Sequence, residues 1–216
     1  MTSSPRQDDR PPLTRDRILD AALVLVDEYG MDGLSMRRLG AALGVEAMSI
    51  YNHVASKHEL LNGVVEKVLN EVEIPEPGGD WTQRIKEMAR SYRKVAQAHP
   101  NVMPLMAMRP FANLPTLPLV EEVFATLANA NIAPEDSLAA LRAVASYAVG
   151  FTTSEVAGFV DDPAAYVANP SFDIESLSSF PHLLEMVPLM SDIDNDSHFE
   201  FGLDVCLQGI KAKLGV

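Results

Sequence analysis

The sequence has only one cysteine, Cys206, among its 216 residues. No disulfide can form within such a chain, which suits a reducing compartment, and we expect a cytoplasmic protein. The chain also lacks any apolar, uncharged run of about eighteen residues, so an ordinary membrane-spanning helix is excluded. Its first twelve residues are polar and proline-containing, without the apolar stretch of a secretory signal, and are expected to form a disordered arm.

Aromatic residues are scarce as well, at 6% of the chain, and we find neither an internal repeat nor a convincing strand pattern. Apolar residues still account for 47%, with Ala, Leu, Val and Met abundant. This mixture provides enough material for a core and favours helices over a β-sandwich. We therefore expect an all-α fold.

Positive charge is in short supply, because the net charge is −13. The first sixty residues carry seven Lys/Arg and nine Asp/Glu, whereas the rest of the chain carries ten and twenty-one. The acidic excess thus lies mostly outside the first sixty residues, and an acidic body would suppress non-specific DNA binding. Charge alone does not indicate a DNA partner, and its distribution does not exclude one.

Motifs of catalysis are missing too. The chain has no glycine-rich phosphate loop, no nucleophile elbow and no His/Cys cluster with metal-ligand spacing. The alternating carboxylates Asp192, Asp194 and Asp196 lack the glycine and glutamate of a calcium loop. We expect a protein that is not an enzyme and that needs neither a metal ion nor a cofactor.

Helical periodicity begins after Thr14, a candidate N-cap, and Gly30 ends this first helix. Its apolar stripe consists of Ile18, Ala21, Ala22, Leu25 and Val26. Shorter helices are expected at about 35–43, with Ser35 as a candidate N-cap, and at 46–53. A longer one is expected from Ser56 to Val72, beginning with the capping-box spacing of Ser56 and Glu59. The Pro/Gly loop at 75–79 is the best domain boundary. Later helices are expected at about 81–98, 101–108, 116–130, 135–160 and 197–214, with 161–195 mostly irregular.

The decisive stretch is Ser35 to His58, where two short helices meet at a tight turn. Gly44 supplies a residue that tolerates positive φ in that turn, and Gly40 lets the second helix pack close to the first. Apolar side chains lock the pair together at Leu39, Leu43, Val45 and Ile50. This arrangement predicts a helix-turn-helix that binds DNA.

The outward face of the second helix carries groups suited to DNA. Hydroxyl, amide and imidazole groups reach base edges or phosphates, and small apolar side chains contact thymine methyl groups. The candidate contacts are Arg37, Ala47, Met48, Ser49, Tyr51, Asn52, His53 and Lys57. Alternatives stay open for three residues nearby: Tyr51 packing on the first helix, His53 hydrogen-bonding at the helix end, and Arg38 simply solvated.

In these residues the sequence resembles the TetR family of repressors. The resemblance rests on the ordered segments Tyr29-Gly30, Gly33 to Leu39, Ala42 to Val45, Ile50 to Val54 and Lys57 to Leu61. It implies Ala47 to His53 as the recognition helix of a homodimer on a palindromic operator, released by a small-molecule ligand. It also implies a DNA-binding domain at 13–60, a connecting helix and linker at 61–79, and a ligand-binding and dimerisation domain at 80–216.

The C-terminal part is similar to the tetracycline repressor branch, through His99-Pro100, Arg109-Pro110 and the helix from Leu138 to Gly158. That branch dimerises through its last two long helices. It holds a magnesium–drug complex partly with a histidine just before the Arg-Pro pair, where this sequence has only Leu, Met and Ala. We expect a largely apolar ligand instead. The candidate pocket residues are Leu105, Met108, Arg109, Phe111, Tyr147, Phe151 and Ser154.

Alternatives remain at this point. The apolar candidates equally fit a plain core, and Arg109 suits either a helix-end cap or an anchor for an anionic ligand. The DNA-binding domain at 13–60, called the head below, would be the same in a transcriptional activator as in a repressor. A scaffold that has lost DNA binding is also consistent with one sequence, although Arg37, Tyr51, His53 and Lys57 argue against it.

Overall fold

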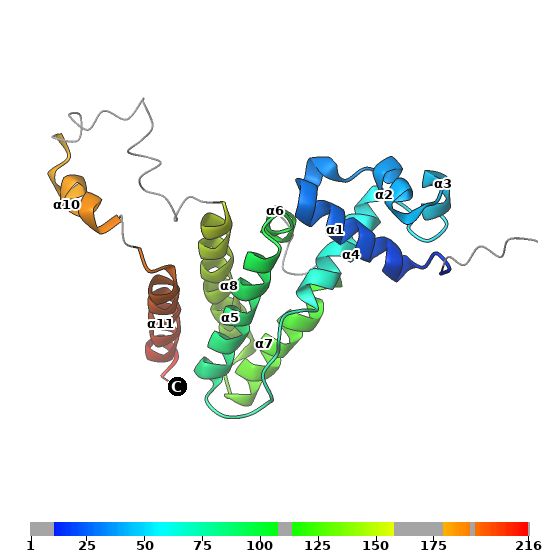
Figure 1. The fold of residues 1–216 in the computed structure, drawn as a ribbon. Helices are drawn as coiled ribbons and strands as arrows, with labels where there is room; N and C mark the ends of the chain where they lie inside the picture. Colours follow the sequence, from blue (N-terminus) through cyan, green and yellow to red (C-terminus); the bar gives the residue numbers. More distant parts are fainter. Residues whose placement is uncertain (1–10, 108–113, 158–178, 191–192, 216) are drawn as a thin grey trace, which may run out of the picture. The chain divides into compact units, whose positions relative to one another are not determined.

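The computed structural model describes residues 11–107, 114–157, 179–190 and 193–215 of the chain. Every regular element within these ranges is helical (Figure 1). The chain divides into two compact units, residues 1–67 and 68–216. This division falls inside the segment 61–79 that the sequence suggests as the connection between domains.

The first unit is built from α1 (Arg15–Gly33), α2 (Met36–Leu43), α3 (Ala47–Ile50) and most of α4 (Lys57–Leu69). Thr14 caps α1 by accepting a hydrogen bond from the Arg17 N–H at 3.2 Å, and Ser35 caps α2 in the same way. The expected break at Gly30 is present, with φ 67° and ψ −175°, but a further turn continues to Gly33.

Apolar side chains fill the interior of this unit at helical spacing. Ile18, Ala22 and Val26 on α1 are fully buried, as are Leu39 on α2 and Ile50 on α3. Helix α2 packs against both α1 and α3. Each of the larger aliphatic side chains among them contributes about 1.5–3 kcal/mol when withdrawn from water. This burial holds the short helices in place, since helices of this length are unstable alone.

The second unit contains α5 (Trp81–Ala98), α6 (Met103–Ala107), a 3₁₀ turn η1 (Leu114–Thr116), α7 (Leu117–Asn129), α8 (Pro134–Val156), α10 (Pro181–Met190) and α11 (Asn195–Leu214). Helix α8 is central, because it contacts α5, α6, α7 and α11. The expected helices agree with these bounds to within a few residues. Within the segment 161–195, the described part includes the ten-residue helix α10.

The core of the second unit joins α5, α8 and α11. Its fully or nearly buried members are Ile85, Met88, Ala89, Val144, Ala148, Phe199, Leu203 and Leu207. Helices α8 and α11 approach closely at Gly202, where an added Cβ would overlap the Tyr147 ring. A larger residue at position 202 would require the Tyr147 ring to shift.

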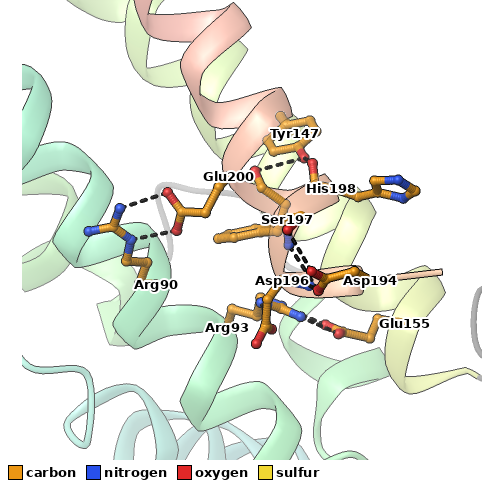
Figure 2. A network of polar contacts seen from close by, with 10 residues as sticks. Arg90, Arg93, Tyr147, Glu155, Asp194, Asp196, Ser197, His198 and Glu200 are labelled. Carbon is orange, nitrogen blue, oxygen red and sulfur yellow. Dashed lines mark hydrogen bonds and ion pairs between the residues drawn. The ribbon is translucent and has the colours of Figure 1, made fainter. Parts of the chain in front are cut away.

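Ion pairs tie α5 to α11 in an antiparallel ladder. Lys86 pairs with Asp204, Arg90 with Glu200, and Arg93 with Asp196, so the residue numbers rise on α5 as they fall on α11. Figure 2 shows the two ion pairs of this ladder nearest the start of α11. These three ion pairs help to fix the register of α5 against α11.

Arg93 is the most buried member of this network. Its guanidinium donates to both Glu155 oxygens on α8, at 2.8 and 2.5 Å, and to Asp196 on α11 at 2.8 Å (Figure 2). It also lies 4.9 Å from the Phe199 ring centroid. The hydrogen bonds that Arg93 donates to the Glu155 carboxylate raise the pKa of Arg93 well above its ordinary value. One arginine thus joins three helices.

No helix in the described part of the chain is long and apolar enough to cross a membrane.

Candidate functional site

The turn between α2 and α3 has the geometry of a helix-turn-helix. Gly44 adopts the left-handed conformation, with φ 70° and ψ 31°, and its N–H caps α2. At Gly40 an added Cβ would lie 2.8 Å from the Val45 carbonyl oxygen and 3.2 Å from the Ala47 nitrogen. Both contacts are to backbone, which cannot move aside. The sequence predictions for these two glycines are confirmed.

The face of α3 that points to solvent carries the predicted contact residues. Met48 is 74% exposed and Tyr51 is 41% exposed, although both are large. Asn52 and His53 are also exposed, while Ala47 and Ser49 are half-buried. Large side chains left in water on a structured turn are typical of an interface.

Helix α3 is shorter than the predicted 46–53, because its regular part ends at Ile50. The backbone nevertheless continues to turn. The N–H of His53 and that of Val54 both donate to the Ile50 carbonyl, at 2.9 and 3.0 Å. Tyr51 to His53 are therefore held by the same hydrogen-bonded structure as α3.

The basic side chains around this face differ in their contacts within the protein. Arg37 is exposed and has no hydrogen bond or ion pair to the residues that the structure describes. Lys57 is exposed, and its ammonium donates to the Leu34 carbonyl at 3.3 Å. Arg38 is exposed, as expected of a solvated arginine, and its guanidinium also lies 4.6 Å from the Tyr29 ring centroid and donates to the Gly33 carbonyl at 3.3 Å.

The start of α4 is fixed by a capping box. Ser56 accepts a hydrogen bond from the Glu59 N–H at 3.1 Å, and the Glu59 carboxylate accepts one from the Ala55 N–H at 2.7 Å. The first bond is that of a capping box, whereas the second comes from the residue before the N-cap and not from the N-cap itself. The two bonds hold Lys57 at the first turn of a helix whose N–H groups favour an anion such as phosphate.

Ion pairs connect the C-terminal part of α4 to α1. Lys67 contacts Asp16 at 2.6 Å and Asp20 at 2.8 Å. The hydrogen bond with Asp16 is the main reason that the pKa of Lys67 is raised. These pairs orient α4 within the head.

The second unit contains an apolar cavity of about 160 Å³. Helices α5, α7 and α8 form most of its wall, with contributions from the end of α4, from α6 and η1, and from α11. Its described lining is Leu69, Trp81, Ile85, Met88, Ala89, Tyr92, Met106, Ala107, Thr116, Leu119, Val120, Val123, Leu127, Ala140, Leu141, Val144, Ala145, Ala148, Val149, Leu207 and Ile210. None of these residues carries a charge.

Four predicted pocket residues lie elsewhere in this unit. Leu105 is buried on α6, beside the lining residue Met106, and Ser154 is half-buried on α8. Tyr147 and Phe151 pack with Phe199, with ring centroids 5.9 and 5.3 Å from it. None of the four belongs to the described lining. The other candidates, Met108, Arg109 and Phe111, lie outside the described residues.

The Tyr147 hydroxyl has its own partners. It donates toward the carbonyls of His198 and Phe199, both at 3.0 Å (Figure 2). Burial raises the pKa of Tyr147. The hydroxyl therefore pins the first turn of α11 to α8.

The contribution of α5 and α7 to the cavity was not predicted from the sequence. Trp81, Ile85, Met88 and Tyr92 follow one another at spacings of three and four residues on α5. This spacing predicts a buried stripe. A stripe that lines a cavity and one that fills a core have the same pattern, so nothing in the sequence distinguishes them.

Comparisons with known proteins agree with this architecture. Residues 18–64 match the family described as bacterial regulatory proteins, tetR family, and residues 74–214 match the tetracyclin repressor-like C-terminal domain. An HTH-type transcriptional regulator of Saccharopolyspora erythraea is 32% identical over 209 residues, covering 96% of this chain and 88% of the relative.

Two further proteins extend the comparison. The HTH-type transcriptional repressor DrrR1 of Streptomyces coeruleorubidus is 27% identical over 217 residues, covering 96% of this chain and 80% of the repressor. A crystal structure of the Streptomyces coelicolor TetR family protein ActR in complex with actinorhodin has a TM-score of 0.80 at 29% identity, covering 94% of this chain and 98% of ActR.

The head and the helical second unit together define a helix-turn-helix transcriptional regulator. The chain belongs to the tetR family of bacterial regulatory proteins, with a C-terminal domain of the tetracycline repressor type.

Proposed function

We propose that this protein is a repressor that binds a palindromic operator as a homodimer and leaves it when a small molecule enters the cavity. The observation that carries the DNA-binding part is the exposed face of α3, which presents Met48, Tyr51, Asn52 and His53 on a turn fixed by Gly40 and Gly44. Exposed side chains on a fixed turn are available to contact DNA.

The contact residues divide into two groups in this proposal. Ala47, Met48, Ser49 and Asn52 face the bases of the major groove and set sequence preference. The remaining four, Arg37, Tyr51, His53 and Lys57, position the head on the backbone. Phosphate contacts supply most of the affinity, and they make it dependent on salt.

The homodimer is proposed to form through α8 and α11. Apolar side chains stand exposed on both helices: Leu138 on α8 is 52% exposed, and Phe201 and Val205 on α11 are 71% and 57% exposed. Phe201 and Val205 are four residues apart and thus share a face of α11. In a symmetric dimer two recognition helices lie about 34 Å apart, one turn of DNA.

The cavity is proposed as the effector site, in preference to the Tyr147–Phe151 cluster, because it combines an apolar lining with unfilled volume. Bound actinorhodin in ActR supports a small-molecule effector for this chain as well. Helix α4 runs without interruption from Lys57 to Leu69, and Leu69 is part of the cavity wall. A ligand that prefers the DNA-free conformation acts by displacing this helix.

The test is a titration of the purified protein against labelled DNA from its own upstream region, at several salt concentrations, with random DNA as the control. Sequence-specific regulation predicts much tighter binding to the upstream region and a steep loss of affinity with salt. If the upstream region fails, selection from a random DNA pool identifies an operator elsewhere. A selection that enriches no sequence would refute the proposed DNA-binding function.

A further inference from the structure

Among the residues that the structure describes, the cavity in the second unit is lined by apolar and neutral side chains only. Among its described wall residues, Tyr92 is the one with a titratable group, and burial raises the pKa of Tyr92 to about 12. The phenol therefore keeps its proton at any pH at which the protein works. An ionised ligand would lose its hydration on entry and would meet no opposite charge on these walls.

Few hydrogen-bonding groups face this space. Trp81, Tyr92 and Thr116 supply the polar side-chain atoms of the described lining, against eighteen residues whose side chains are apolar. Walls of this kind favour a ligand that is itself mostly hydrocarbon, with a small number of polar atoms to fix its orientation.

Tyr92 has a hydrogen bond that a ligand can improve. Its hydroxyl donates to the Met103 sulfur at 3.8 Å, and a thioether is a weak acceptor. Met103 is itself fully buried on α6. Burying a hydroxyl with so weak a partner is costly, and a carbonyl oxygen brought within reach would relieve that cost.

We propose that the cavity binds an uncharged, largely apolar ligand with a carbonyl oxygen that accepts a hydrogen bond from the Tyr92 hydroxyl. This inference rests on the proposed function, since it takes the cavity to be the effector site. The volume of about 160 Å³ is close to that of an apolar cavity of roughly 150 Å³ that admits benzene, so one aromatic ring is a suitable probe.

Three single-ring probes of nearly equal shape separate charge from hydrogen bonding. Acetophenone is neutral and has a carbonyl, ethylbenzene is neutral and has none, and benzoate is an anion at neutral pH. Ligand-observed NMR titration of the full-length protein is expected to give acetophenone at least tenfold tighter binding than benzoate.

The variant Tyr92→Phe keeps the ring and removes the hydroxyl. Acetophenone is expected to bind about three- to tenfold more weakly to it, which corresponds to one neutral hydrogen bond, while ethylbenzene is unaffected. Equal weakening of both neutral probes would show that Tyr92 only shapes the cavity, and the assignment would be overturned.

Variants that place a large side chain in the cavity test whether the probes bind there. Ala145→Phe on α8 is expected to abolish binding of both neutral probes, whereas Ala128→Phe, at an exposed position on α7, leaves it unchanged. Thermal melting verifies folding, and Val120→Phe serves as a second filling variant if the first is unstable. Probes that still bind both filled variants would lie elsewhere and overturn the proposal.

Two other outcomes contradict it. Benzoate binding as tightly as acetophenone would show that the cavity accepts anions. If benzoate binding were then lost in Arg109→Gln, that arginine would be identified as the anchor for the anion. Failure of all three probes would remove the proposed ligand class. Operator binding, measured on the same preparation, is independent of the probes and distinguishes this failure from failure of the proposed function.

Discussion

At the scale of single residues, the head depends on Gly40. The Cβ of an alanine at this position would press on the Val45 carbonyl and the Ala47 nitrogen, and α3 would have to move outward. Gly40→Ala is expected to destabilise the protein by about 1–3 kcal/mol, as overpacking usually does, and to weaken operator binding. Urea unfolding and fluorescence anisotropy measure the two effects. Ala42→Ser, at an exposed position on the same helix, should change neither.

The contact assignment is tested at the same scale by removing two side chains. Tyr51→Ala combined with Lys57→Ala is expected to abolish operator binding without unfolding the protein, because Tyr51 is 41% exposed and the loss of Lys57 removes one part-buried hydrogen bond, to the Leu34 carbonyl. Lys94→Ala, on the exposed face of α5, is the matched control for loss of a positive charge. Tight operator binding by the double variant would refute the assignment.

At the scale of helices, the pairing of Arg93 with Glu155 joins α5 to α8. Glu155→Leu leaves a buried guanidinium with Asp196, whose side chain is 85% exposed, as its remaining carboxylate partner among the described residues. We expect a loss of about 3 kcal/mol in the free energy of unfolding. The double variant Arg93→Met with Glu155→Leu should recover most of that loss, because no charge is left unpaired. Urea unfolding of the four proteins measures the coupling, and additive losses would contradict it.

The Arg90–Glu200 pair adds a pH dependence to the packing of α5 on α11. Hydrogen bonding with Arg90 lowers the pKa of Glu200 below its ordinary value of 4.5. The stabilisation is therefore present above pH 4.5 and is lost as the pH falls through the lowered, folded-state pKa. Glu200→Gln should flatten the acid side of the stability curve. The effect at neutral pH should be below about 1 kcal/mol, since both side chains are a third or more exposed.

Thermal melting between pH 3 and 7 measures this difference. Glu121→Gln, on the exposed part of α7, is the control and should follow the wild-type curve. A Glu200→Gln curve parallel to that of the wild type would show that the ion pair contributes nothing in solution.

Helices were the part that the sequence predicted best. The caps at Thr14, Ser35 and Ser56 and the turn at Gly44 act through neighbours along the chain, so their signals are local and readable. The cavity could not be predicted in this way. Its walls come from helices far apart in sequence, and Tyr147, a candidate by its position on α8, packs against α11 instead.

At the scale of the whole molecule, the proposed function depends on the two DNA-binding units of a homodimer acting together. Large exposed apolar residues are unusual on a protein that works as a monomer, especially when they share a helix face. Phe201 and Val205 on α11 form such a pair, at 71% and 57% exposure. We expect Phe201→Glu with Val205→Glu to give a folded monomer, because dimerisation would bury like charges without partners.

Sedimentation velocity then gives the mass, and anisotropy gives the affinity for the operator and for one half-site. A monomer loses the second recognition helix, so affinity for the full operator should fall to that for a half-site, while the half-site affinity stays the same. Ile74→Glu, which changes an exposed apolar residue away from α8 and α11, should leave the dimer intact. A doubly charged variant that remains dimeric would place the interface on another surface. A monomer that still binds the full operator with wild-type affinity would show that one head is sufficient, and symmetry could then no longer explain recognition.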